Sequence, residues 1–446
     1  MLISFAVGLL AWRTVSARVV VIGGGSAYMP GIAFGLVHAH AAFTDATVVL
    51  QDIDGDALEL QRRLTENILR SRGAGDVRVE AQPDRLRAME GADVVLAAFR
   101  PGGFAARHLD ERIAIDHGVV GQETAGPGGF AMALRSVPIV LEIAEEMRRV
   151  AANDAWLLDY TNPVQVVSEA MARFGPDVAF LGLCDQTSGE ESFIAQLLGE
   201  NASDVELDTC GTNHMTFTRA VRVNDRDVTQ ELWSLLDELD LGALETDEQR
   251  HIVRLFRILR HIPSEYLQYY FFHDAVLAKQ RAAGRTRAEE IMAILPDVVA
   301  SYRREADADR PAPSMARASE GHGDFAVQIA ATLLSGARQR FILNLPNEGQ
   351  VQDLPAGAIV ETPATIDDGR VEPIAQGSLP FEVSGLVRQV AAHAALTAEA
   401  ALTGDRSLAV KALTIHPLVR SPDRAASLVD AYLGAHAASL PRFGPS

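Results

Sequence analysis

The chain has 446 residues, of which 48% are hydrophobic and 22% charged, a composition typical of a globular protein of roughly two or three domains. Its 40 basic and 59 acidic residues give a formal net charge of −19 without a basic patch, so we expect no nucleic-acid partner. The two cysteines, Cys184 and Cys210, are too few for a disulfide scaffold and favour a reducing, cytoplasmic location.

The first segment of the chain, residues 1–17, contains a short apolar run that ends at Trp12. This run is too short to span a bilayer as a helix, and no basic segment precedes it as in a secretion signal. We interpret residues 1–17 as an N-terminal extension outside the fold. The rest of the sequence has no apolar run of membrane-spanning length, so we expect no membrane partner.

Strands and helices are predicted to alternate from residue 18 onward. The predicted strands are 18–22, 47–51, 94–98, 156–158 and 178–183, and the predicted helices between them include 56–71 and 136–152. Short apolar strands separated by helices are typical of a doubly wound parallel sheet covered on both faces. The sequence therefore predicts an α/β fold with an N-terminal Rossmann-like domain over residues 18–195.

The second half of the chain has a different pattern. Helical segments around 227–310 and 381–435 flank a stretch rich in proline and glycine, 341–379, whose composition favours strands. We therefore predict a C-terminal α+β domain over residues 196–446.

A glycine turn follows the first predicted strand. Gly23, Gly24, Gly25 and Ser26 lie between the strand and a helix start, where glycine lets the backbone approach a pyrophosphate at the helix N-terminus. Asp52 ends the second strand, where its carboxylate is placed to accept a hydrogen bond from a ribose. Together these features predict NAD binding, and the acidic strand end disfavours the 2′-phosphate of NADP.

Five further segments carry polar residues in unusual density. They are Arg100 to Glu111, Gly121 to Gly129, Asp159 to Pro163, Gly182 to Asp185 and Gly211 to His214. Several of them follow predicted parallel strands, and ligands of open parallel sheets bind at the carboxyl ends of the strands. We therefore expect three of these segments to converge at the edge where the cofactor lies.

Cys184 and His214 could bind a catalytic divalent metal and leave positions open for substrate oxygens. Each also has an ordinary structural interpretation, since cysteine at a strand end is often a small buried hydrophobe and a lone histidine is often a hydrogen-bonded core residue. We interpret Cys210, a rival ligand, as a core residue. Asp185 could act as a general acid or cap the following helix.

A resemblance to a known family rests on the order of these motifs. They are the glycine turn, the 51–54 acidic end, Arg107, Gly121–Thr124, Thr161–Pro163, Gly182–Asp185, Asn213–His214, 263–270, 286–290, 344–349 and 416–419. In this order they resemble glycoside hydrolase family 4, the NAD-dependent glycosidases, over about residues 18 to 435. The fold that the resemblance implies is like that of lactate and malate dehydrogenases, with the C-terminal domain contributing to catalysis, substrate binding and oligomerisation.

The resemblance implies specific roles for residues that match the family motifs. It implies a divalent metal, usually Mn²⁺, on Cys184 and His214, with Asp185 as the proton donor and Tyr266 as the proton acceptor. Its implied sugar contacts are Arg107, Asn162 and Asn213, with Arg287 contacting substrate in members that act on 6-phosphosugars. The implied oligomer is a homodimer or homotetramer, and the implied partner is a small glycoside.

The implied reaction is hydrolysis of an O-glycosidic bond without net redox change. NAD⁺ takes hydride from sugar carbon 3, the proton on carbon 2 is removed, the aglycone is eliminated, water adds, and hydride returns. Departures from the family pattern are Gln186 and Thr187 after the Cys-Asp pair and His261 before Tyr266. They leave the substrate open among an α-glucoside, its 6-phosphate and a uronide, with Cys-Asp and Thr-Arg-Ala favouring the 6-phospho-α-glucoside.

Two alternatives belong to other functional classes. One is an NAD-dependent 2-hydroxyacid dehydrogenase of the lactate/malate type, which shares the fold but needs an Asp-paired histidine and arginines that clamp the substrate. The other is a non-catalytic NAD-binding sensor, against which the retained Cys184, Asp185, His214 and Tyr266 argue. Stoichiometric release of NADH would distinguish a dehydrogenase from a glycosidase.

Overall fold

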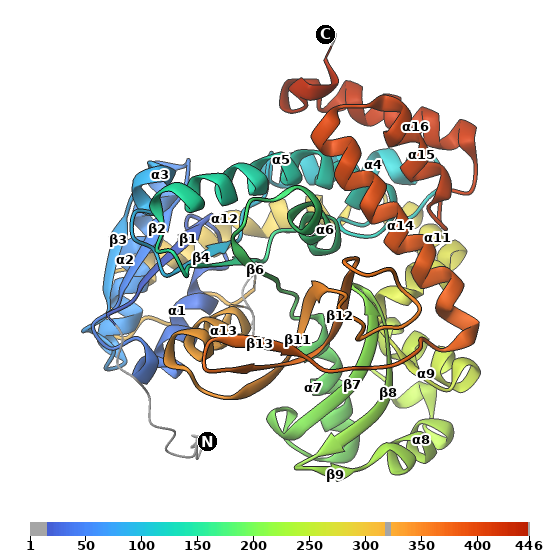
Figure 1. Cartoon of the computed structure of the whole chain (residues 1–446), viewed down its shortest axis with the longest axis horizontal. Helices are drawn as coiled ribbons and strands as arrows, with labels where there is room; N and C mark the ends of the chain where they lie inside the picture. Colours follow the sequence, from blue (N-terminus) through green and yellow to red (C-terminus); the bar gives the residue numbers. More distant parts are fainter. Residues whose placement is uncertain (1–15, 317–322, 445–446) are drawn as a thin grey trace.

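The computed structural model describes residues 16–316 and 323–444, and its strands form one 13-stranded sheet. The strand order is β10-β8-β7-β12-β11-β6-β5-β4-β1-β2-β3, with β13 beside β12 and β9 beside β8 (Figure 1). From β3 to β6 all neighbouring pairs are parallel, and their order, 3-2-1-4-5-6, is that of dinucleotide-binding sheets. The predicted Rossmann-like α/β fold is therefore confirmed.

The parallel half matches most of the predicted elements. Its strands are β1 Arg18–Ile22, β2 Thr47–Gln51, β3 Arg78–Ala81, β4 Val94–Ala97, β5 Trp156–Asp159 and β6 Ala179–Gly182. Its helices are α1 Met29–His38, α2 Gly55–Ser71, α3 Arg85–Ala88, α4 Gly103–Asp116, α5 Gly126–Val150, α6 Val164–Phe174 and α7 Gln186–Leu198. The predicted boundary at residue 195 falls within α7.

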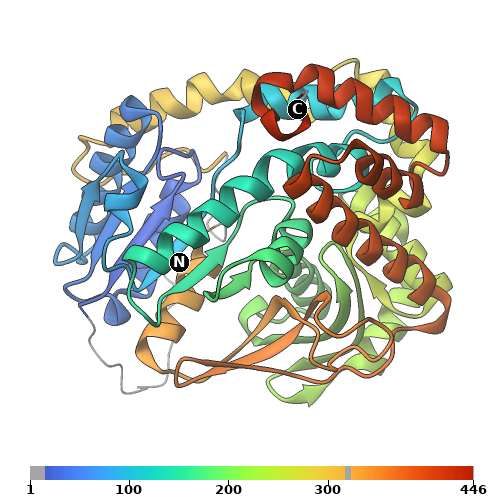
Figure 2. The ribbon, with the colours of Figure 1, turned by 45° about the horizontal axis from the view of Figure 1, so that its top comes forward.

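The alternation of side chains along the parallel strands produces two cores. On one face, Val20 and Ile22 belong to the cluster that includes α5, α6, α14 and α15, while Val19 and Val21 pack on the other face with α1 and α13. Successive strand residues point to opposite faces, so a continuous apolar run is buried on both sides. Figure 2 shows α5 crossing one face of the sheet.

Two elements of this half differ from the prediction. Strand β3 was not predicted, because its alternately exposed residues are those of a polar sheet edge. Helix α5 begins at Gly126 rather than at Ser136, since Gly128 and Gly129 resemble a loop in sequence but start a helix in close contact with the preceding segment. A Cβ atom on Gly128 would lie 2.2 Å from the carbonyl oxygen of Gln122.

The C-terminal half adds antiparallel strands and further helices, as an α+β domain requires. Its strands are β7 Val205–Thr212, β8 Met215–Val223, β9 Arg226–Asp227, β10 Ile262–Pro263, β11 Gln339–Pro346, β12 Ile359–Asp367 and β13 Arg370–Pro373. Its helices are α8 Thr229–Glu238, α9 Asp247–Leu259, α10 Gln268–Phe271, α11 His273–Ala283, α12 Arg287–Glu305, α13 Asp324–Ser335, α14 Phe381–Thr403, α15 Arg406–Ile415 and α16 Pro422–Ala435.

The two halves share the sheet. Asn344 of β11 pairs antiparallel with Gly182 of β6, so the strand that precedes the predicted metal ligand Cys184 lies beside the C-terminal strands. Helix α13 packs against α1, and helices α14 and α15 pack against α5. The active-site edge of the parallel strands is therefore bordered directly by elements from the second half.

Two predictions about the chain ends and membranes bear on this fold. Residues 1–15 of the predicted extension lie outside the described residues, whereas Ala17 is buried and its carbonyl oxygen accepts a hydrogen bond from the Thr47 amide at 2.8 Å. Among the described residues, one helix, α5, is long and apolar enough to cross a membrane by length and composition. Since 78% of its apolar window is buried, α5 has the packing of a core helix.

Candidate active site

The polar segments after β4, β5 and β6 meet at the carboxyl edge of the parallel sheet. Cys184 and Asp185 follow β6, and Asn162 follows β5. The hairpin of β7 and β8 reaches the same edge with Asn213 and His214 at its tip. As predicted, strand ends converge there, but the hairpin comes from the antiparallel half of the sheet.

The predicted metal ligands are in direct contact. The Sγ atom of Cys184 lies 3.3 Å from Nε2 of His214, and both residues are buried. His214 occupies the left-handed backbone region with a φ of +62°, a strained conformation that is often found at functional sites. Within residues 16–316 and 323–444, no third histidine, cysteine, aspartate or glutamate joins a metal-binding group. The pair therefore leaves most coordination positions open for other ligands.

Tyr266, the predicted proton acceptor, stacks on this pair. It lies in the short helix η4 (Glu265–Leu267) after β10, and its ring is 3.5 Å from the His214 ring between centroids, at an angle of 8°. Ser264 caps the start of this short helix, and its hydroxyl oxygen accepts a hydrogen bond from the backbone N–H of Tyr266. The local turn and the ring stacking together hold the phenol beside the two ligands.

Burial keeps the three groups uncharged in the absence of a cation. It lowers the pKa of His214 to about 3, so the imidazole offers a lone pair near neutral pH. Burial, with help from Glu361 and Asp185, raises the pKa of the Cys184 thiol, and burial together with Tyr269 raises the pKa of Tyr266. A bound divalent cation would oppose the shifts of Cys184 and Tyr266, because its charge favours the thiolate and the phenolate, and it would favour the uncharged imidazole of His214 further.

Asp185, the predicted proton donor, occupies the N-cap position of α7. Its side chain makes no capping hydrogen bond, so the structural alternative of a helix cap does not explain this carboxylate. Burial raises the pKa of Tyr160, and the charge of Asp185 raises it further. Asp185 therefore lies close to Tyr160, the residue that follows β5, and to the predicted metal ligand Cys184.

Arg107, a predicted sugar contact, is buried on α4 among carboxylates. Its Nε atom donates to Glu111 at 2.7 Å and its Nη1 atom lies 2.9 Å from Glu123, which is also 2.6 Å from Arg100. Burying a guanidinium requires such paired charges. Two arginines and Glu123 thus form a charged group beside His214, whose pKa the carboxylate of Glu123 also influences.

Asn213, another predicted sugar contact, makes hydrogen bonds within the protein. Its amide side chain donates to Glu361 Oε1 at 2.9 Å, and its backbone N–H donates to Gln165 at 2.9 Å. Asn344 donates to the same Glu361 oxygen at 3.0 Å. Sequence reasoning missed Glu361, whose only signal is an acidic residue inside the apolar strand β12; its pKa is raised to about 6 by burial.

The remaining predicted substrate residues are Asn162, after β5, and Arg287, on α12. The Asn162 carbonyl oxygen accepts a hydrogen bond from Ser136 at 3.0 Å. Arg287 begins α12 with a side chain that is 63% exposed and pairs with Glu290 at 2.8 Å. The next residue, Ala288, donates its N–H to Glu111, the partner of Arg107, so the start of α12 is anchored to the Arg107 group.

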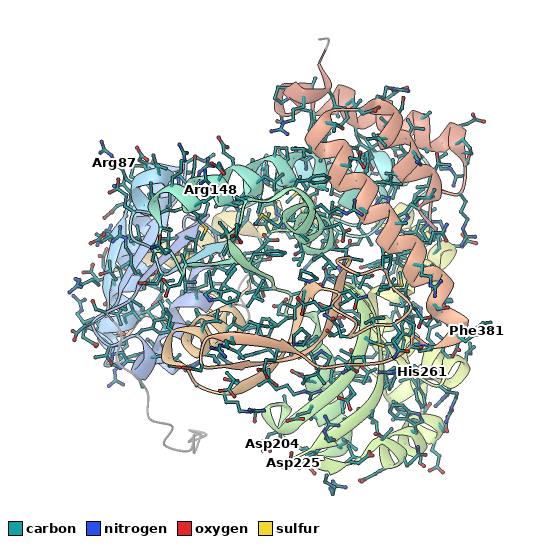
Figure 3. The ribbon with its side chains drawn as sticks, in the orientation of Figure 1. Arg87, Arg148, Asp204, Asp225, His261 and Phe381 are labelled. Atoms are coloured by element: carbon teal, nitrogen blue, oxygen red, sulfur yellow. The ribbon has the colours of Figure 1, made fainter. Side chains whose placement is uncertain are left out.

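His261 departs from the family pattern and lies near the molecular surface. Its Nδ1 atom is 3.6 Å from Glu382, the second residue of α14. Figure 3 shows His261 and Phe381 at the same edge of the molecule. The contact between His261 and Glu382 thus connects the segment after α9 to the start of α14.

The predicted nucleotide turn joins β1 to α1 at the point where the strand order reverses. The amides of Gly23 and Gly24 donate to the Gln51 carbonyl oxygen, and the Gly25 amide donates to Asp52 Oδ2 at 2.9 Å. A Cβ atom on Gly23 would lie 2.5 Å from the Ala98 carbonyl oxygen, so the turn packs tightly against the end of β4. Dinucleotides bind in this kind of crevice.

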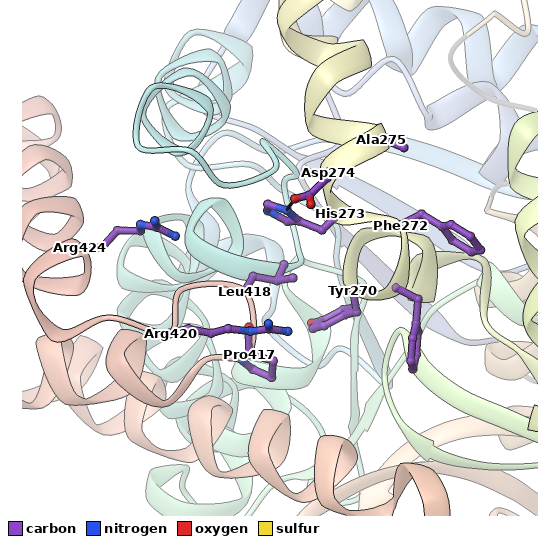
Figure 4. Close-up of a pocket in the computed structure, with 10 residues that line it drawn as sticks. Tyr270, Phe272, His273, Asp274, Ala275, Pro417, Leu418, Arg420 and Arg424 are labelled. Atoms are coloured by element: carbon purple, nitrogen blue, oxygen red, sulfur yellow. Dashed lines mark hydrogen bonds and ion pairs between the residues drawn. The ribbon is translucent and has the colours of Figure 1, made fainter.

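A separate cavity of about 520 Å³ lies between the start of α11 and the loop before α16 (Figure 4). In Figure 4 the side chains of Tyr270 and Arg420 point toward one another, and His273 lies across from them. The described residues that line this cavity include none of the predicted site residues. Tyr270 faces this cavity although it is close in sequence to Tyr266.

Family models match almost the whole described chain. The model of family 4 glycosyl hydrolases matches residues 18–200, and the model of the C-terminal domain of this family matches residues 209–419. The chain belongs to family 4 of the glycosyl hydrolases. The family that the order of motifs resembles is therefore confirmed, and the protein is a glycosidase.

Individual relatives cover nearly the full length of this family 4 protein. It is 31% identical over 442 residues to a probable 6-phospho-beta-glucosidase of Bacillus subtilis, covering 96% of this chain and 98% of the relative. A 6-phospho-alpha-glucosidase from gut microorganisms, in complex with NAD and glucose-6-phosphate, has a TM-score of 0.86 and 26% identity, covering 95% of this chain and 99% of that one.

A third similar structure contains a metal ion. A 6-phospho-beta-glucosidase from Thermotoga maritima with manganese, NAD⁺ and glucose-6-phosphate has a TM-score of 0.85 and 28% identity, covering 95% of this chain and 99% of that one. A malate dehydrogenase from Plasmodium falciparum has a TM-score of 0.52 at 13% identity, which shows a shared fold alone. The dehydrogenase alternative is thus a distant fold relative.

Proposed function

We propose that this family 4 glycosidase hydrolyses 6-phospho-α-glucosides with NAD⁺ and a divalent metal, Mn²⁺, as cofactors. The observation that carries the proposal is the contact of Cys184 with His214 at 3.3 Å, with the Tyr266 ring stacked on the histidine. This cluster lies at the carboxyl edge of the NAD-type sheet. It combines two metal ligands and a candidate base within one buried site.

The nucleotide turn fits NAD⁺. The turn of Gly23 to Ser26 leads into α1 at the point where the strand order reverses, and each Asp52 carboxylate oxygen accepts one backbone hydrogen bond, which leaves acceptor capacity for ribose hydroxyls. Ile53 is 99% exposed, an apolar surface next to Asp52 against which an adenine ring could pack. When bound, NAD⁺ supplies the hydride acceptor, and NADH the returning hydride donor, for sugar carbon 3.

The pair Cys184 and His214 fits a divalent metal. A thiol and an uncharged imidazole 3.3 Å apart are a suitable donor set, and substrate oxygens and water would complete the coordination. When bound, the cation supplies positive charge that polarises the oxygens on carbons 2 and 3 of the sugar. Its charge also favours the thiolate of Cys184 and the phenolate of Tyr266, against the effect of burial on both pKa values.

Two side chains of this site would transfer protons. Tyr266 would remove the proton from carbon 2 and hold it on the phenol oxygen. Asp185 would donate a proton to the glycosidic oxygen as the aglycone leaves, since it directly follows Cys184 at the carboxyl edge of the sheet. The buried group of Arg107, Glu111 and Glu123 would orient the sugar hydroxyls.

The substrate class rests on the relatives and on Arg287. Both α- and β-acting relatives act on 6-phosphoglucosides by name. The exposed guanidinium of Arg287, anchored near Arg107 through Ala288, could exchange its ion pair with Glu290 for a phosphate group. The Cys-Asp pair favours the α-anomer through the family resemblance. The domain division at residue 195, the homodimer or homotetramer and the cytoplasmic location stay predictions.

Hydrolysis of p-nitrophenyl glucosides tests the proposal. The α- and β-D-glucosides and their 6-phosphates would be assayed with NAD⁺, Mn²⁺ and a thiol reductant, each omitted in turn. We expect nitrophenol release from the 6-phospho-α-glucoside to require NAD⁺ and Mn²⁺ without accumulation of NADH. The unphosphorylated α-glucoside should be about 10- to 100-fold slower, since it lacks the charge-assisted hydrogen bonds that a phosphate would make with Arg287.

Each other outcome contradicts a defined part of the proposal. Faster release from the 6-phospho-β-glucoside would overturn the anomeric assignment, and equal rates with and without the phosphate would overturn the role of Arg287. Stoichiometric NADH would indicate net oxidation of the sugar rather than hydrolysis. Release that needs neither NAD⁺ nor Mn²⁺ would contradict the cofactor requirement.

The variant Asp185→Asn tests the proton donor. We expect kcat to fall by about 10²–10⁴-fold for alkyl 6-phosphoglucosides, because their leaving oxygen needs a proton, and by much less for p-nitrophenyl substrates. The measurement is kcat against the pKa of the leaving group in the wild type and the variant. Equal losses for all leaving groups would contradict general-acid catalysis by Asp185.

A further inference from the structure

The segment between α4 and α5 makes a hydrogen-bond contact with the metal-ligand pair that the proposed reaction does not use. Thr124 Oγ1 lies 3.0 Å from His214 Nδ1 and 2.8 Å from Gln122 Oε1. We propose that Thr124, oriented by Gln122, holds His214 in the Nδ1–H tautomer and thereby sets the affinity of the site for its divalent metal. This inference rests on the proposed metal site at Cys184 and His214.

The orientation of the Gln122 side chain is determined by two backbone amides. The N–H groups of Thr124 and Ala125 both donate to Gln122 Oε1, at 2.5 and 2.6 Å. An amide nitrogen carries two hydrogens and cannot accept these bonds, so the atom at this position must be the oxygen. The usual ambiguity between the two ends of a glutamine amide is therefore absent here.

The oxygen of Gln122 determines where the Thr124 hydroxyl hydrogen lies. A carbonyl oxygen has no hydrogen to donate, so the 2.8 Å contact requires the hydroxyl of Thr124 to donate to Gln122. A hydroxyl has a single hydrogen, and Thr124 Oγ1 therefore meets His214 Nδ1 as an acceptor. The hydrogen in that second contact belongs to Nδ1 of the imidazole.

The tautomer has a direct consequence for metal binding. A neutral imidazole carries one ring hydrogen, and with that hydrogen on Nδ1 the lone pair of Nε2 points toward Cys184 Sγ, 3.3 Å away. The other tautomer would present an N–H to the metal position. Ligating histidines are commonly oriented in this way by a hydrogen bond to their second nitrogen.

The segment is packed too tightly to let Thr124 turn away easily. A Cβ atom on Gly128 would lie 2.2 Å from the Gln122 carbonyl oxygen, and one on Gly129 would lie 2.1 Å from the Thr124 carbonyl oxygen. The first turn of α5 therefore lies directly against the backbone of both residues. On the other side, the Tyr266 ring holds His214 by stacking.

The variants Thr124→Val and Thr124→Ser test the inference. Valine keeps the shape of threonine without the hydroxyl, whereas serine keeps the hydroxyl. Mn²⁺ would be titrated into NAD⁺-bound protein and free Mn²⁺ followed by electron paramagnetic resonance. We expect Thr124→Val to weaken Mn²⁺ binding by about 10- to 100-fold and Thr124→Ser to keep most of the affinity, with kcat of Thr124→Val recovering at saturating Mn²⁺.

Equal Mn²⁺ affinity in Thr124→Val and wild type, with NAD⁺ affinity and Tm unchanged, would overturn the inference. If Thr124→Val does not fold, nitrogen NMR of the wild-type protein with ¹⁵N-labelled histidine decides instead, with His214 assigned by the loss of its signal in His214→Gln. Hydrogen on Nδ1 is expected, and hydrogen on Nε2 would overturn the inference. Wild-type protein that fails to bind Mn²⁺ would contradict the proposed function instead, and the tautomer would still be measured.

Discussion

Cys184→Ser is expected to lower Mn²⁺ affinity by at least about 100-fold and to abolish hydrolysis at ordinary Mn²⁺ concentrations. The serine hydroxyl stays protonated, so the site loses the negatively charged ligand next to His214 Nε2. NAD⁺ affinity should stay unchanged, since the glycine turn follows β1, which is separated from β6 by β4 and β5. Mn²⁺ titration and NAD⁺ binding would be measured on the same preparation.

Cys210→Ala is a matched control for this prediction. Cys210 is also a free, buried cysteine, but it packs with Met215, Phe217 and Leu267 in an apolar cluster, as the sequence interpretation expected. Its replacement should leave Mn²⁺ affinity and activity close to wild type. Full activity in Cys184→Ser, or an equal loss in both variants, would contradict the assignment of Cys184 as the metal ligand.

Tyr266→Phe is expected to stop the exchange of deuterium from solvent into carbon 2 of the sugar and to lower kcat by about 10²–10⁴-fold. Phenylalanine keeps the ring that stacks on His214 at 3.5 Å, so the metal ligands should stay in place while the proton acceptor is lost. Exchange would be followed by proton NMR in D₂O, and Mn²⁺ affinity would be measured in parallel.

Tyr270→Phe supplies the control for the loss of a buried phenol in the same region. Tyr270 stands close to Tyr266 in the chain, but it faces the separate cavity of Figure 4, and its ring approaches His416. This variant should keep carbon 2 exchange and most of the activity. Exchange that persists in Tyr266→Phe would remove Tyr266 as the base, whatever the control does.

The parallel half of the fold could be predicted closely because its signals are local. Strands β1 and β2 have the predicted bounds because each contains a run of valines, and the glycine turn after β1 marks the crossover to α1. Helix α5 was predicted too short, since the close approach of Gly128 to Gln122 is a tertiary contact. The edge strand β3 has no apolar signal of its own.

The sequence predicted which residues belong to the candidate site better than it predicted how they are arranged in space. Cys184, His214 and Asp185 were candidates from their own chemistry, and Tyr266 came from the order of family motifs. The structure brings the cysteine into contact with the histidine and the histidine into contact with the tyrosine. Glu361 could not be predicted, because its place depends on which strands are neighbours. In the sheet, Glu361 of β12 pairs with Gly211 of β7 on one side and with Asn344 of β11 on the other.

The sequence by itself determined the class of fold, the glycine turn and the chemical types of the side chains proposed to react, because periodicity, turn chemistry and motif order depend on residues that are close together in the chain. Only the tertiary structure decided that Thr124 contacts His214, that Asn213 donates to the buried Glu361, and that Arg287 pairs with Glu290 at the surface. These contacts depend on the register between strands and on the packing of α5 and α12, which join segments far apart in the sequence.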